Sequence, residues 1–213
     1  MSAWTWTMVK ASVVPEDTVE KLLERAERSI RNRWYFKGSQ TEDGYNEVLK
    51  EWIEIQKEYE DDYYISELKM KKEECTDEFY KKKLDLWIER DKNNLVDIEK
   101  IRNKEMSFVD FLKKHIDSDG LSSVNSNIMC RILNGDIYVE VPSIFRLREY
   151  SDMSFYNGLS TVDSLIEYLK EPYRQEIITD YLTGTTGLTE SLEKRIREFY
   201  GKFGDGNFTV HFG

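Results

Sequence analysis

The sequence is poor in residues that interrupt regular structure and in residues that hold metals or disulfides. Its 213 residues include three Pro, two Cys and two His. Because proline removes a backbone hydrogen-bond donor, its scarcity favours a high content of helix and strand. Cys75 and Cys130 stand far apart and outside any CxxC pair, which excludes a disulfide framework and indicates a reducing compartment.

Long apolar runs are also missing. No stretch approaches the roughly 18 consecutive apolar residues that a membrane-spanning helix needs. The first 14 residues have polar interruptions and a single late Lys10, which is not the pattern of a secretory signal. We therefore expect a cytoplasmic protein without a membrane partner.

The residue patterns of catalytic and cofactor sites are absent as well. His115 and His211 have no ligand-spaced neighbours, and Cys130 falls in an expected core strand. The 117–120 segment begins like a calcium loop but lacks the closing acid, and the 184–187 segment lacks the lysine of a phosphate loop. We predict no metal, no cofactor and no catalytic residue.

Acidic and aromatic residues are abundant. There are 41 acidic against 31 basic residues, a formal net charge of −10, and 28 aromatic residues (13 Tyr, 10 Phe, 5 Trp) that argue against disorder. This charge opposes direct binding to nucleic acid and suits a basic partner. One strip of basic residues lies late in the first short helix and comprises Lys21, Arg25, Arg28, Arg31 and Arg33. We expect these residues to complement the dipole of that helix and to pair with the acids of the long helix that begins near residue 41.

The longest stretch without helix breakers, 41–104, predicts two long amphipathic helices. The first begins at Thr41 or Asp43, and the second begins after Thr76, whose hydroxyl is a good N-cap. Apolar residues of the first recur every three or four positions from Tyr45, with Glu47, Glu51, Glu54 and Glu58 among those on the opposite face. In the second, Asp91 falls on the apolar stripe and weakens it.

A polar turn between two stripes of similar length predicts an antiparallel helical hairpin. The alternative is one unbroken helix in a coiled-coil dimer, which the lack of strict heptads disfavours. We expect residues 41–104 to be an insertion, and residues 1–40 and 105–213 to form the core.

Three regions have the alternation of strands. They are 4–14, a hairpin of 128–133 and 137–141 around Asn134-Gly135, and 208–212. Residues 124–133 as a helix remain an alternative. Helices are expected from Ser107, Ser160, Pro172 and Leu188, with 143–159 irregular. The fold class predicted is α+β, with a small antiparallel sheet joining the N-terminal strand, the central hairpin and the C-terminal strand.

The most suggestive segment lies at the end of the first long helix, where acids and tyrosines alternate. Carboxylates on a rigid helix can occupy a basic groove, and tyrosine adds contact area at low entropic cost. The predicted partner-binding residues are Glu54, Glu58, Tyr59, Glu60, Asp61, Asp62, Tyr63 and Tyr64. The competing interpretation is a solvated charged face with Tyr59 and Tyr63 packed on the second helix.

The hypothesis is thus a non-enzymatic, acidic protein-binding module of the kind that phages or mobile elements use as inhibitors. Its partner would be a basic protein, for example a nucleic-acid-binding enzyme or its nucleoprotein complex, bound by a monomer or a homodimer. The alternatives are a helical scaffold that dimerises through the long helices and a small enzyme with a charged pocket near the central hairpin. For the enzyme, the first residues to examine are Asp117, Asp119, Arg131, Arg146 and Arg148.

Overall fold

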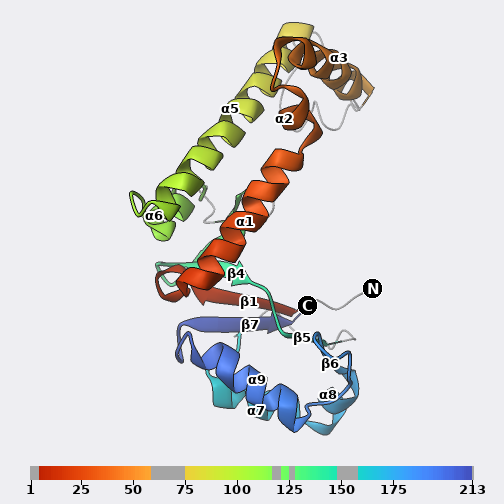
Figure 1. Ribbon diagram of the computed structural model, residues 1–213. Coiled ribbons are helices and arrows are strands. Elements are labelled where there is room, and N and C mark those ends of the chain that lie inside the picture. The colour runs from red at the N-terminus through yellow and green to blue at the C-terminus, as the bar shows by residue number, and fades with distance from the viewer. Residues whose placement is uncertain (1–4, 59–74, 117–120, 125–127, 148–157, 213) are drawn as a thin grey trace. The chain divides into compact units, whose positions relative to one another are not determined.

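The computed structural model describes residues 5–58, 75–116, 121–124, 128–147 and 158–212. The chain divides into two compact units (Figure 1). The first comprises Met1–Leu23 with Ser107–Gly213, and the second comprises Glu24–Met106. The fold is α+β, as the sequence predicts.

A five-stranded antiparallel sheet organises the first unit. Its order is β2-β3-β4-β1-β7, so the N-terminal strand lies between the central hairpin and the C-terminal strand. The strands are β1 (Thr5–Lys10), β2 (Leu121–Val124), β3 (Ile128–Leu133), β4 (Asp136–Val141) and β7 (Phe208–Phe212). The predicted joining of terminal strands and hairpin is confirmed, and β2 is an additional strand that we did not predict.

The backbone angles of the Asn134-Gly135 turn show whether residues 128–133 are strand or helix. Asn134 and Gly135 have φ angles of 52° and 85°, which a two-residue β-hairpin turn of type I′ requires. Cys130 then pairs with Val139, and Leu133 pairs with Asp136. Residues 128–133 are therefore strand, and the helical alternative is wrong there.

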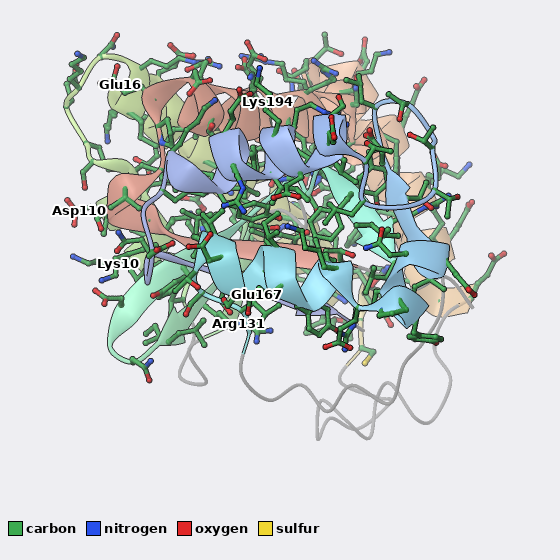
Figure 2. The ribbon with its side chains drawn as sticks, turned by 90° about the horizontal axis from the view of Figure 1, so that it is seen from below. Lys10, Glu16, Asp110, Arg131, Glu167 and Lys194 are labelled. Carbon is green, nitrogen blue, oxygen red and sulfur yellow. The ribbon has the colours of Figure 1, made fainter. Side chains whose placement is uncertain are left out.

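The core of the first unit lies between one face of this sheet and two helices, α7 (Val162–Lys170) and α9 (Glu190–Gly201). Figure 2 shows these helices side by side, with Glu167 on α7 and Lys194 on α9. Phe208 and Val210 on β7 pack among the helix residues Leu165 and Ile196. Tyr200 is fully buried, and its hydroxyl lies 2.8 Å from that of Thr7 on β1.

Three local expectations in the first unit are wrong. Residues 143–159 include a strand, β5 (Phe145–Leu147), which pairs with β6 (Ile178–Asp180). The sequence predicts a helix from Pro172 through Tyr181, but the helix ends at Ile177 as α8, because the chain enters β6 there. The cap of α7 is Thr161, which accepts the Ser164 amide, and not Ser160.

Three further helical segments among the described residues belong wholly or partly to this unit. The 3₁₀ turn η1 (Ala11–Val13) follows β1, and α1 (Glu16–Asn32) begins after it. Helix α6 (Phe108–Lys113) begins at the predicted cap, where Ser107 accepts the Asp110 amide.

The second unit is helical throughout its described length. It contains α1 from Glu24 onward and three further helices, α2 (Trp34–Gly38), α3 (Glu42–Glu58) and α5 (Asp77–Arg102). Thr76 caps α5 as predicted, accepting the Phe79 amide.

Helices α3 and α5 pack antiparallel within one chain. Three contacts run in opposite directions along them: Tyr45 with Asp85, Trp52 with Tyr80, and Lys57 with Asp77. Trp52 and Trp87 meet with ring centroids 5.0 Å apart. The predicted intramolecular hairpin is therefore present.

Candidate protein interface

One face of α3 carries an unbroken row of carboxylates. The row comprises Asp43, Glu47, Glu51, Glu54 and Glu58, all exposed. Their spacings of four, four, three and four residues keep them within about 80° of one another around a helix of 3.6 residues per turn. At 1.5 Å per residue the row is about 22 Å long. We call it the acidic stripe.

None of these five carboxylates forms an ion pair with another residue that the structure describes. Two lysines border the stripe: Lys57 is 2.6 Å from Asp77 on α5, and Lys50 is exposed. Like charges three or four residues apart on a helix destabilise it by about 0.2–0.5 kcal/mol per pair. Neighbouring carboxylates of the stripe therefore repel one another, and Lys50, three residues after Glu47 and four before Glu54, offsets part of that repulsion.

Apolar packing on the opposite face holds α3 in place. Val48 and Trp52 are buried, and the Trp52 indole donates a hydrogen bond of 3.1 Å to the Tyr80 carbonyl oxygen. Tyr45 donates to Asp85 at 2.6 Å, and burial together with this carboxylate raises the pKa of the Tyr45 hydroxyl. The stripe thus sits on a helix that is fixed along its length.

Glycines allow α2 and α3 to approach closely. A Cβ on Gly44 would overlap the carbonyl oxygen of Gly38, and a Cβ on Gly38 would overlap the Val48 side chain. Both residues lack a positive φ angle, so their role is to leave space. The start of α3 is therefore positioned by direct contact between the two helices.

A buried ion pair joins α5 to the junction of α1 and α2. The Asp91 side chain is fully buried; Arg33 Nη1 lies 2.9 and 3.0 Å from its two carboxylate oxygens, and the Tyr35 hydroxyl donates at 2.9 Å. Burial and the neighbouring Asp91 raise the pKa of Tyr35. Asp91 was expected to weaken the apolar stripe of this helix, but its charge is paired inside the unit.

The predicted interface residues fall partly on the acidic stripe. Glu54 and Glu58 belong to it and are exposed. Tyr59, Glu60, Asp61, Asp62, Tyr63 and Tyr64 lie outside the described residues. The sequence predicts Glu47 and Glu51 on the same face as Glu54, because they precede it by seven and three residues, but they are not among the predicted interface residues.

The residues proposed for an enzyme give no common site among those that the structure describes. Arg131 is exposed on β3 of the larger sheet, and Arg146 is exposed on β5 of the smaller one. Arg146 lies over the ring of Tyr181, 5.9 Å from its centroid. Asp117, Asp119 and Arg148 lie outside the described residues.

Backbone amides of the glycine-rich loop after β6 donate hydrogen bonds within the protein. Gly184 N–H donates to the Asp180 carbonyl oxygen, and Gly187 N–H donates to that of Ile178. The buried Asp180 carboxylate accepts from Arg195, the Leu182 amide and Thr183; burial opposes its ionisation, but these donors lower its pKa. This network orders the loop and leaves these amides unavailable to an anion.

The described part of the chain holds no group of three or more His, Cys, Asp or Glu side chains that could bind a metal ion. Within the same residues, no helix has both the length and the apolar character to cross a bilayer. The chain matches no protein-family model, and neither curated proteins nor solved structures show significant similarity to it.

Proposed function

We propose that this chain is a non-enzymatic protein-binding module that docks the acidic stripe of α3 on a basic surface of a partner. The observation that supports the proposal is the row of five exposed carboxylates without ion pairs. A row of mutually repelling carboxylates that form no ion pair gains when a cationic surface neutralises it.

The charges of the stripe are wider apart than the phosphates of a nucleic-acid strand. The stripe has one carboxylate per roughly 5.6 Å, whereas a DNA strand has one phosphate per 3.4 Å of axis, so the stripe is a sparse imitation of a nucleic-acid backbone. We propose further that the module inhibits a nucleic-acid-binding enzyme by occluding its basic surface, and that both proteins are cytoplasmic.

The rigid support of α3 favours specific recognition. Trp52, Val48 and Tyr45 are held by α5 and α2, so little side-chain or backbone freedom at the base of the stripe is lost on binding. Exposed carboxylates steer a basic partner over a Debye length of about 10 Å at 0.1 M salt. Binding should therefore be fast and sensitive to salt.

The test is capture of proteins from extracts of the native host on the immobilised full chain. A variant with Glu47→Gln, Glu51→Gln and Glu54→Gln removes the centre of the stripe. A control with Glu167→Gln, Glu176→Gln and Glu190→Gln changes the net charge equally, at exposed acids without ion pairs in the first unit.

The proposal expects a basic protein that binds the wild type and the control and is released by about 0.5 M salt, where screening is strong. Its recovery on the stripe variant should fall at least tenfold. Equal recovery on the stripe variant and the control would refute the acidic stripe as the binding face.

A further inference from the structure

The outer face of α1 in the helical unit has the opposite charge to α3. Arg25, Arg28 and Arg31 are exposed there, with Glu24 as the only exposed acid among residues 24–32. Arg31 pairs with Glu27 at 2.8 Å. Arg25 and Arg28 form no ion pair with any residue that the structure describes. The predicted pairing of the basic strip with the acidic helix is therefore absent at these two residues.

Helices α1 and α3 lie in tandem along the same side of α5. On α1, Glu27 meets Arg102 at 2.8 Å, and Arg33, just beyond its end, meets Asp91. On α3, Tyr45 meets Asp85. As the chain advances from α1 to α3, the contacted residues of α5 therefore move from its C-terminal half, Arg102 and Asp91, to its N-terminal half, Asp85.

The charged faces of both helices point away from α5. On α1, Glu27 contacts Arg102 of α5, and Arg25 and Arg28 lie about 160° and 100° from Glu27 around the helix. On α3, Trp52 is buried on the side opposite the acidic stripe. The surface that the two helices form thus has a basic part followed by an acidic part.

Such a surface is complementary to a copy of itself turned by a two-fold rotation. We infer that a second copy of this chain docks on it, with the arginines of α1 from each copy against the acidic stripe of α3 from the other. The two contacts are identical, as an isologous interface requires. Arg25 and Arg28 have the same three-residue spacing as Glu51 and Glu54, so the charges match in register.

This inference rests on the proposed function, because it assigns the same stripe a second occupant. The dimer masks the stripe until a more basic partner displaces the second copy. Exposed ion pairs contribute little each, and the net charge of −10 opposes association, so the dimer is weak and dissolves in salt.

The test uses sedimentation equilibrium of the full chain at 100 µM in 20 mM and in 500 mM salt. We expect twice the monomer mass in low salt and the monomer mass in high salt. One variant, Arg25→Glu with Arg28→Glu, reverses the basic part; the other, Glu51→Arg with Glu54→Arg, reverses the acidic part. Each alone should be monomeric, because its two contacts then bring like charges together.

Mixing the two variants provides the decisive comparison. In a mixed pair both contacts are again between opposite charges, so the equimolar mixture should recover the dimer mass. The control, Lys82→Glu with Lys92→Glu, makes the same charge change at exposed residues of α5 and should lower dimer formation less than the arginine variant does. Circular dichroism verifies that every variant is folded.

Three outcomes overturn the inference: a monomeric wild type in low salt, a dimer that survives in both single-sided variants, or a mixture that stays monomeric. None of these outcomes contradicts the proposed function, because a monomer still exposes the acidic stripe to a partner. Conversely, sedimentation could show a dimer with the expected charge dependence while the capture experiment finds no partner that needs the stripe. That result would support the dimer and refute the proposed function.

Discussion

Replacing Arg33 by methionine should destabilise the helical unit strongly. The Asp91 side chain is fully buried, and Arg33 contacts both of its oxygens. Breaking a buried ion pair by removing one partner typically costs about 3–5 kcal/mol, because the remaining charge is left without its partner. Here we expect about 3 kcal/mol, since Tyr35 still donates to Asp91, the Arg33 side chain is itself 20% exposed, and methionine keeps the apolar stem.

The companion variants separate the ion pair from general damage. Asp91→Leu removes the buried charge and should cost about 2 kcal/mol, because Arg33 can turn toward solvent while the Tyr35 hydroxyl loses its acceptor. The double variant Arg33→Met/Asp91→Leu should cost less than the sum of the two by about 2 kcal/mol or more. Arg90→Met is the control: Arg90 is half exposed, 3.8 Å from Asp91 and 5.4 Å from the centroid of the Trp87 ring, so its loss should stay within about 1 kcal/mol.

Urea unfolding followed by tryptophan fluorescence measures these free energies. Trp34, Trp52 and Trp87 lie in the aromatic cluster beside Asp91, so three of the five tryptophans of the chain report this unit. A loss below about 1 kcal/mol in Arg33→Met, or strict additivity in the double variant, would refute the assigned role of the buried pair.

Three further perturbations test other parts of the structure. Gly44→Ala should destabilise by about 1–3 kcal/mol, because its Cβ would overlap a backbone oxygen, whereas Gly201→Ala, with open space around it, should not; urea midpoints compare them. Burial raises the pKa of Tyr200 to about 12, so the folded state keeps this proton when the unfolded chain loses it near pH 10. Stability should be complete below about pH 10 and fall toward pH 12, with a shallower fall in Tyr200→Phe measured by alkaline urea titration. Glu51→Gln should raise stability by a few tenths of a kcal/mol in low salt and not in 1 M salt, since it relieves repulsion with two neighbours; an unchanged midpoint in low salt would contradict the repulsion.

Local chemistry made much of the fold predictable. Thr76 and Ser107 cap helices because their hydroxyls accept amides three residues on, and Asn134-Gly135 closes a hairpin because both accept a positive φ. These signals involve residues a few positions apart, so a sequence shows them directly.

Contacts between distant residues were not predictable in the same way. The sequence predicts that Asp91 weakens the apolar stripe of its helix, because its partner Arg33 is 58 residues away and the pairing is not visible in the sequence. Strands β5 and β6 are three residues each and pair only through the fold, so neither shows the alternation of a longer strand. For the interface, helical periodicity fixed the face that carries Glu54 and Glu58, but the sequence alone could not show which of its acids lacked counter-charges.

The salt dependence of partner binding is the most direct test of the account. Fluorescence anisotropy with the captured basic protein gives its affinity for the wild type and for the Glu47→Gln, Glu51→Gln and Glu54→Gln variant between 50 and 500 mM salt. We predict weaker binding by the variant and a shallower decrease of its affinity with salt, because fewer charges take part. Equal affinities with equal slopes would show that the stripe of α3 is not where the partner binds.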